Sequence, residues 1–138
     1  MNKTKNIISW IFAIISALIM LQTLYFKFSA APESVYIFST LGIEPWGRIG
    51  SGIGELIASI LIIIPSLRWL GASLGLGIIT GALFAHLTKL GISVQNDGGY
   101  LFVLGIIVFV GCGICLYLDK EKVKQIYARI FSRNQKHT

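Results

Sequence analysis

Four long apolar stretches are the feature that most constrains how this chain can fold. They cover about residues 7–26, 49–67, 69–88 and 99–118, and each is about 20 residues long. Since an α-helix rises about 1.5 Å per residue, each stretch can cross the roughly 30 Å hydrocarbon core of a bilayer. Backbone polar groups cannot stay unpaired in lipid, and no short alternating strands of a barrel are visible. The sequence therefore predicts an all-α fold, an integral membrane four-helix bundle within residues 1–118.

The composition agrees with a membrane protein and not with an ordinary soluble domain. Hydrophobic residues make up 54% of the 138 residues, charged residues only 13%, and the mean hydropathy is +0.75. Lys3 and Lys5 before an apolar run could also begin a signal peptide. However, the first stretch is longer than a typical signal-peptide core, and Pro32 follows Ala31, where we expect it to hinder cleavage. We therefore interpret the first stretch as a membrane helix.

The distribution of basic residues predicts the orientation in the membrane. Nine lie before the first stretch, between the second and third stretches, or after the fourth, and four helices would place all these segments on one side of the membrane. The other three lie on the opposite side. The nine are Lys3, Lys5, Arg68, Lys120, Lys122, Lys124, Arg129, Arg133 and Lys136, and the three are Lys27, Arg48 and Lys89. Basic residues collect on the cytoplasmic side. We expect a bacterial cytoplasmic (inner) membrane protein with both termini in the cytoplasm.

Residues 119–138 form a basic tail that we expect in the cytoplasm. Val123, Ile126, Tyr127 and Ile130 recur at helical spacing, which predicts an amphipathic helix on the membrane surface as far as about Phe131. We expect disorder after Ser132. The net charge of +6 lies largely here, beside the membrane, so it indicates contact with anionic lipids and not a nucleic-acid partner.

The longest connection, between the first two stretches, predicts a further short helix at the outer face. Pro32 is typical of a helix start, Glu33 suits the first turn, and Gly42 is typical of a stop. Between them Val35, Phe38 and Leu41 form one apolar stripe. The sequence thus predicts a short outer amphipathic helix that forms a lid over the four helices.

Ionisable residues within membrane spans are costly, so each is a candidate functional residue. The candidates expected to converge on the outer half of the membrane, and to form a binding site there, are Lys27, Arg48, Glu55, His86 and Lys89. In one interpretation Glu55 pairs with Arg48 or Lys27 to hold helices together, while His86 satisfies a backbone carbonyl or extends to the membrane interface. In the other, Glu55 is a proton acceptor or counter-ion and His86 its proton-active partner in a polar pocket.

Glycines and cysteines suggest close packing. Gly71, Gly75, Gly77 and Gly81 in the third stretch are expected to let helices approach, within the chain or in a homodimer.

Cys112 and Cys115 spell C-x-x-C, as in redox pairs, and four-helix quinone reductases of the vitamin K epoxide type have such a pair. This pair lies in the predicted cytoplasmic half, where thiols stay reduced, and the extra loop cysteines of those enzymes are missing. We therefore expect the two cysteines to pack.

The order of several short motifs resembles the DoxX family and its DoxX-like relatives. Phe26-Lys27-Phe28 ends the first stretch, the connection closes on Leu41-Gly42-Ile43 and Pro45, and Arg48, Gly52 and Glu55-Leu56 open the second. The Arg68 turn and the late Ala85-His86 pair are similar too. The resemblance covers about residues 7–118 and implies a small four-helix bundle. Family members are described as subunits of thiosulfate:quinone oxidoreductase or of other membrane oxidoreductase complexes, and distant animal relatives as receptor-assembly chaperones.

Two classes of function follow. The favoured one is a membrane binding or assembly subunit, not catalytic on its own, whose pocket holds a lipid-like ligand or a partner protein. The other is a membrane subunit of a quinone-linked oxidoreductase complex, in which Glu55 and His86 handle protons. The chain carries no cofactor motif, and with His86 and His137 as its only histidines we expect no metal or haem site. The candidate ligands are a quinone or a lipid, and the candidate partners are membrane lipids, another membrane protein or a second copy.

Overall fold

The computed structural model describes residues 2–135, and these residues form helices joined by short loops, with no strand among them. This confirms the all-α prediction. The elements are α1 (Lys3–Phe28), α2 (Pro32–Thr40), α3 (Trp46–Ile62), the 3-10 turn η1 (Pro65–Leu67), α4 (Arg68–Ala85), the π-helical turn η2 (His86–Leu90), α5 (Tyr100–Leu118) and α6 (Lys120–Gln135).

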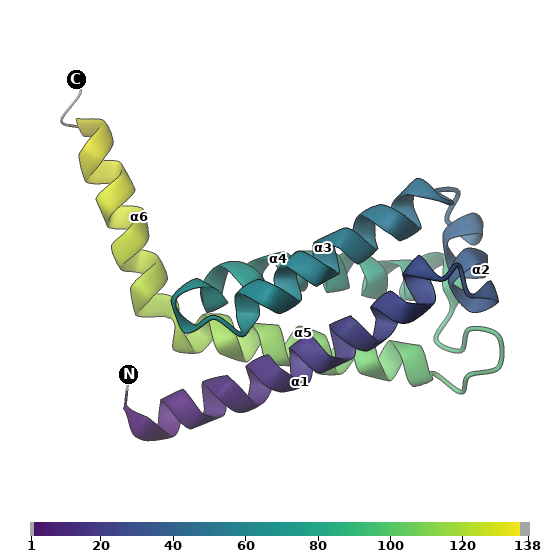
Figure 1. Ribbon diagram of the computed structural model, residues 1–138, viewed down its shortest axis with the longest axis horizontal. Coiled ribbons are helices and arrows are strands. Elements are labelled where there is room, and N and C mark those ends of the chain that lie inside the picture. The colour runs from purple at the N-terminus through teal and green to yellow at the C-terminus, as the bar shows by residue number, and fades with distance from the viewer. Residues whose placement is uncertain (1, 136–138) are drawn as a thin grey trace.

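Four long helices lie alongside one another (Figure 1). α3 packs against α1 and α4, and α5 also packs against α1 and α4, so the four helices form a closed ring. The start of α1 and the η1 turn lie at one end, which we call the N-terminal end. α2 and the loop of residues 91–99 lie at the other, which we call the α2 end.

Within residues 2–135, three helical segments are long and apolar enough to cross a membrane: Lys3–Phe28, Pro65–Leu90 and Tyr100–Leu118. α3 is shorter than the predicted stretch 49–67, with 17 residues that end at Ile62. The cause is Pro65, which disfavours a helical conformation in the residue before it. Ile64 accordingly adopts an extended backbone with φ −95° and ψ 113°, and the chain turns there.

Large apolar side chains cover the outward faces of all four long helices. Leu18 on α1 is 63% exposed, Ile53 on α3 48%, Phe84 on α4 67% and Val103 on α5 52%. Soluble monomers rarely expose contiguous apolar surface of this extent. The exterior therefore suits lipid better than water.

Small residues bring the helices close together in the part nearer the N-terminal end. A Cβ atom at Gly71 would lie 2.4 Å from the backbone nitrogen of Ile62, so α4 meets the backbone of α3 there. A Cβ atom at Gly75 would lie 3.1 Å from Cys112 Sγ. The predicted packing role is thus confirmed for these two glycines. Packing within the chain is wrong for Gly77 and Gly81, where an added Cβ would meet no atom of the chain within 4 Å.

Cys112 and Cys115 are both 0% exposed and belong to the same packed core as Ala13 and Ala17 of α1. Cys115 Sγ lies 3.7 Å from the carbonyl oxygen of Ser9. Both cysteines therefore pack in the core, as expected, and neither thiol reaches the surface.

The two flanking helices differ partly from their predicted forms. α2 begins at Pro32 as expected, and Gly42 follows its end with φ +77°, a conformation that favours glycine. α6 begins directly after Asp119, contacts α5 and points away from the four packed helices (Figure 1). Its helix continues to Gln135, so the disorder expected after Ser132 is wrong for residues 133–135. The rest of that expectation, residues 136–138, lies outside the described residues.

We expect Gly71→Ala to lower the stability of the protein, because the new methyl group would overlap the backbone of α3. Overpacking of this kind costs about 1 to 3 kcal/mol. Gly113→Ala is the matched control, since a Cβ there meets no atom within 4 Å. The measurement is the thermal unfolding midpoint in detergent. Equal midpoints for the two variants would contradict the close contact between α3 and α4.

Candidate functional site

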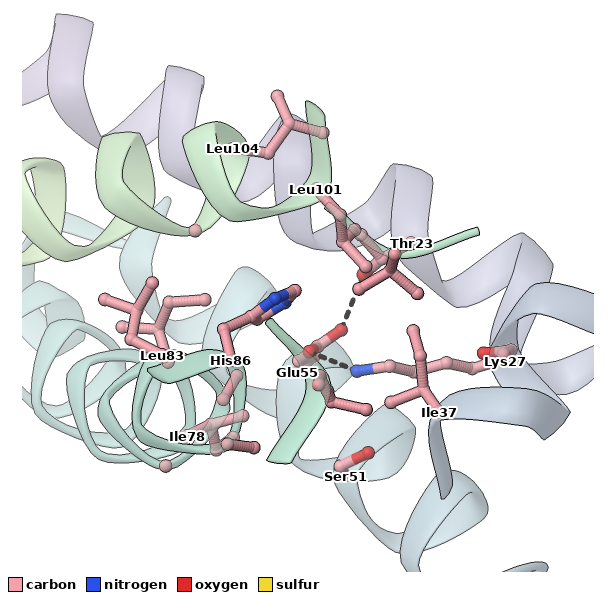
Figure 2. Close-up of a pocket in the computed structure, with 18 of the residues that line it drawn as sticks. Thr23, Lys27, Ile37, Ser51, Glu55, Ile78, Leu83, His86, Leu101 and Leu104 are labelled. Atoms are coloured by element: carbon pink, nitrogen blue, oxygen red, sulfur yellow. Dashed lines mark hydrogen bonds and ion pairs between the residues drawn. The ribbon is translucent and has the colours of Figure 1, made fainter. Parts of the chain in front are cut away.

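A cavity of about 670 Å³ lies between the long helices toward the α2 end (Figure 2). Every element except η1 and α6 contributes to its wall. Its apolar lining includes Ile19, Met20, Ile79, Leu83, Leu101, Leu104 and Val108, and its polar lining includes Thr23, Lys27, Ser51, Glu55, His86 and Asp97. α2 contributes Ser34 and Phe38, both buried, so this helix covers the cavity as predicted.

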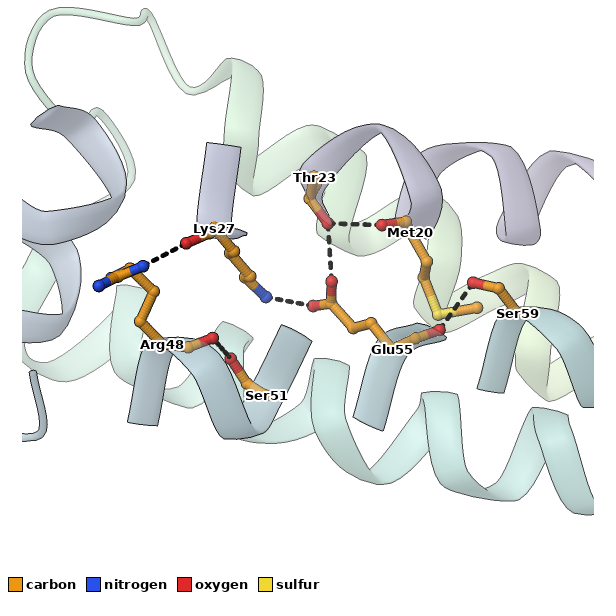
Figure 3. Close-up of polar contacts among 7 residues, drawn as sticks. All are labelled: Met20, Thr23, Lys27, Arg48, Ser51, Glu55 and Ser59. Atoms are coloured by element: carbon orange, nitrogen blue, oxygen red, sulfur yellow. Dashed lines mark hydrogen bonds and ion pairs between the residues drawn. The ribbon is translucent and has the colours of Figure 1, made fainter. Parts of the chain in front are cut away.

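Glu55 of α3 is the centre of the polar lining. It is only 7% exposed and forms an ion pair with the Lys27 ammonium of α1. The Thr23 hydroxyl, one turn earlier on α1, lies 2.7 Å from Glu55 Oε2 and 2.8 Å from the carbonyl oxygen of Met20 (Figure 3). The carboxylate therefore has a partner on each oxygen, and both partners come from α1. Of the two predicted partners, the structure selects Lys27.

Arg48 does not reach Glu55, although the two residues share one face of α3. Its Nε donates to both carboxylate oxygens of Glu44, at 2.8 and 3.1 Å. Its Nη1 donates to the backbone carbonyl of Lys27 near the end of α1, where carbonyls lack helical partners (Figure 3). Arg48 does not line the cavity, and we infer that it holds the end of α1 so that the Lys27 side chain can reach Glu55.

His86 lies on the cavity wall, one residue after the end of α4, and is 5% exposed. Its Nδ1 lies 2.9 Å from the carbonyl oxygen of Gly91, and its ring meets Phe102 edge-on at 5.6 Å between centroids. Because a carbonyl only accepts hydrogen bonds, Nδ1 must carry a hydrogen. In the neutral ring Nε2 is then an acceptor, and it has no hydrogen-bond partner among residues 2–135.

The structure brings three of the five predicted site residues to one cavity: Lys27, Glu55 and His86. Lys89 does not join them, because it lies exposed in the η2 turn and outside the cavity lining. Within residues 2–135 no group of three His, Cys, Asp or Glu side chains could hold a metal ion.

Asp97 lines the cavity but was not among the predicted site residues. Its Oδ1 accepts hydrogen bonds from the backbone N–H groups of Val94 and Gly99, and its Oδ2 from that of Leu101. Burial raises the pKa of this carboxyl, but the three N–H groups and nearby His86 outweigh it and lower the pKa overall. The turn-forming run Asn96-Asp97-Gly98-Gly99 was the available signal, since Asp commonly organises such turns.

The cavity reaches the surface along one edge of α4. Gly77, Gly81 and Ala82 all line the cavity and are also exposed. Because the two glycines have no side chain and an added Cβ would meet nothing, the wall is thin at this edge. A molecule could therefore enter from the side of the four helices without crossing the α2 end.

Comparison with known protein families, with curated proteins and with solved structures finds no match.

We expect Glu55→Gln and Lys27→Gln each to lower stability markedly, since each leaves the partner charge largely buried and uncompensated. Removing one member of a buried pair costs about 3 to 5 kcal/mol. The double variant should be more stable than the sum of the two losses predicts, because it leaves no lone charge. Unfolding midpoints of the four proteins measure this cycle. Additive losses would contradict a direct Lys27–Glu55 interaction.

Proposed function

We propose that this chain is a four-span membrane protein whose cavity binds an amphiphilic molecule, and that it serves as a binding or assembly subunit without catalysis of its own. The cavity of about 670 Å³ carries this proposal. Its volume lies within the roughly 300 to 1,000 Å³ usual for ligand pockets, and such pockets combine apolar walls with a few polar groups. A lipid-like ligand would place its polar group near Glu55 and His86 and its apolar part against α4 and α5.

The exterior of α3 supports a fourth membrane span. Ile49, Ile53, Ile57 and Ile60 recur along one face and are each 42–49% exposed. The 17 residues of α3 are at the lower limit of the range of about 17 to 25 residues that span a bilayer. Moreover, α3 packs between α1 and α4, two helices that are long and apolar enough to cross. A span by α3 completes the four-helix membrane bundle.

The excess of basic residues at the N-terminal end supports an orientation with that end in the cytoplasm. The cavity and α2 then face the outer side, and the membrane is a bacterial inner membrane. The basic helix α6 lies along the inner surface, with Tyr127 and Ile130 turned to the lipid and its cations near anionic headgroups. We assign the chain to the DoxX-like proteins on the motifs of its sequence.

One observation favours a second function, that of a subunit in a quinone-linked oxidoreductase complex. Glu55 and His86 line the same cavity, and His86 Nε2 has no hydrogen-bond partner among the described residues. A quinone offers carbonyl oxygens that a protonated Nε2 could donate to, and reduction of a quinone takes up protons that both groups could pass on. In that role the electrons come from a partner protein, and Glu55 and His86 handle protons.

We expect purified full-length protein to carry a co-purifying lipid or quinone, detected by native mass spectrometry after gentle extraction. Gly81→Leu places a side chain at the cavity edge and should lower the bound fraction about tenfold or more, since steric overlap costs about 1 to 3 kcal/mol. Gly113→Leu is the control, because Gly113 does not line the cavity. Equal occupancy in both variants would overturn the cavity as the binding site. The mass of the released molecule decides between lipid and quinone.

The proposed orientation makes a separate prediction. Cysteine at Trp46 or Asn96 should react with an impermeant thiol reagent added outside intact cells, whereas cysteine at Ser132 should react only after the membrane is opened. All three positions are exposed, and the native Cys112 and Cys115 are 0% exposed, so they should stay silent. Labelling of Ser132→Cys from outside would reverse the topology and place the cavity on the cytoplasmic side.

A further inference from the structure

A second pocket, of about 390 Å³, lies at the N-terminal end and is separate from the cavity. Residues from the start of α1, the η1 turn, the start of α4 and the α5–α6 junction form it. Its lining is mostly charged and consists of Lys5, Asn6, Pro65, Arg68, Leu118, Asp119, Glu121 and Lys122. This pocket has no role in the function proposed above.

Arg68 is held in this pocket by three contacts with two helices, α1 and α3, and one of its guanidinium nitrogens has no partner among the described residues. The residue is 3% exposed. Its Nε donates to the carbonyl of Ile62 at 2.9 Å, its Nη1 donates to the Ser9 hydroxyl at 2.9 Å, and its guanidinium carbon lies 4.3 Å from the Trp10 ring. Its Nη2 is buried and has no hydrogen-bond partner in the described part of the chain. A strong, oriented donor therefore has no acceptor.

Asp119 supplies the complementary group in the same pocket. The residue is 6% exposed, and its Oδ2 is buried without a partner among residues 2–135. Burial raises the pKa of its carboxyl, although Lys122 and Arg68 oppose the shift. A buried donor or acceptor without a partner destabilises the folded protein. Arg68 and Asp119 both line this pocket, and one carries an unsatisfied donor and the other an unsatisfied acceptor. The pair points to a ligand that offers both an acceptor and a donor.

The charges around the pocket define that ligand further. Arg68, Lys5 and Lys122 contribute three positive charges, and Asp119 and Glu121 contribute two carboxyl groups. Lys122 also donates to the carbonyl of Pro65 at 3.2 Å, which places its ammonium at the rim. Such a set matches a group that carries an anion and, a short distance away, a cationic N–H donor.

We propose that this pocket binds the headgroup of an aminophospholipid, with its phosphate on Arg68, Lys5 and Lys122 and its ammonium on Asp119. The proposal rests on the membrane position proposed above, in which this pocket lies at the inner headgroup level. The acyl chains would follow the exposed apolar surface of α1, where Ile7 is 50% exposed and Ile11 49%. The bound lipid would join α1, α4 and α5 where α6 turns away along the membrane surface.

Lipid competition tests the headgroup chemistry. Full-length protein in detergent is titrated with phosphatidylethanolamine, phosphatidylcholine or phosphatidylglycerol of identical acyl chains, and the unfolding midpoint is measured. Phosphatidylethanolamine should raise the midpoint most, because phosphatidylcholine has no N–H donor and phosphatidylglycerol no cation. An equal or larger shift with either of the other lipids would overturn the assignment. Soluble O-phosphoethanolamine is the fourth probe, and an equal shift at the same concentration would overturn a lipid as the source.

Two variants test the residues. Lys122→Gln should lower the bound fraction of phosphatidylethanolamine roughly tenfold in native mass spectra, since a charged hydrogen bond contributes about 1.5 to 3 kcal/mol. Arg129→Gln removes the same charge from α6 but lies outside the pocket, so it should bind as the unaltered protein does. If both variants lose the same bound fraction, the loss comes from the total positive charge of α6 and not from the pocket, which would overturn the site.

Asp119→Asn should abolish the preference for phosphatidylethanolamine over phosphatidylcholine while the protein remains folded. The folded-state pKa of this carboxyl is raised, so the ionised form destabilises the fold at pH values above that pKa, and a neutral amide removes this penalty. A preference that survives in Asp119→Asn would contradict the proposed ammonium contact. Because Gly81→Leu alters only the cavity, failure of this site and failure of the cavity proposal are distinguishable.

Discussion

The close approach of the helices near the N-terminal end is the constraint on which the rest of the structure depends. In the membrane position proposed above, apolar helices would gain no hydrophobic energy from leaving lipid for one another, so they would associate through dispersion contacts and small residues. Gly71 meets the backbone of α3, and a Cβ at Gly111 would lie 2.3 Å from the Ser16 hydroxyl of α1. Toward the α2 end no such contacts are made by Gly77 and Gly81. The same four helices are therefore tightly packed in one part and enclose a cavity in the other.

The free-energy cost of the buried charges at the α2 end is reduced because these charges form two local ion pairs. Lys27 pairs with Glu55 across the α1–α3 contact. Arg48 pairs with Glu44, which lies four residues earlier in the sequence. An unpaired charge in this surrounding would carry a penalty of several kcal/mol, on the order of the whole stability of a small domain. With both carboxylate oxygens of Glu55 satisfied, His86 Nε2 is one group at which a ligand would form a new hydrogen bond without breaking an ion pair.

The two ends of the structure differ in the interactions that would bind a ligand. The cavity at the α2 end has large apolar walls and few unsatisfied groups, so shape and apolar contact would contribute most of the binding energy there. The pocket at the N-terminal end is smaller and mostly charged, and it holds the buried unpartnered atoms Arg68 Nη2 and Asp119 Oδ2. Binding there would come from charge-assisted hydrogen bonds. Under the two proposals, one chain would hold two different amphiphiles, one at each end.

The sequence by itself determined the number and order of the long helices, because hydropathy, Pro32 and Gly42 act through local chemistry that needs no tertiary contact. The bounds of α3 and α6 differ from the predicted ones. The sequence also determined that Glu55 needs a partner. Only the tertiary structure decided that the partner is Lys27, that Arg68 is buried and not an exposed loop cation, and that Gly71 packs while Gly77 does not. Helical periodicity defines the faces of one helix, whereas the rotation and depth of its neighbours decide which of those faces meet. The rotation and depth of each helix depend on contacts between residues far apart in the chain, and these contacts cannot be inferred from a single sequence.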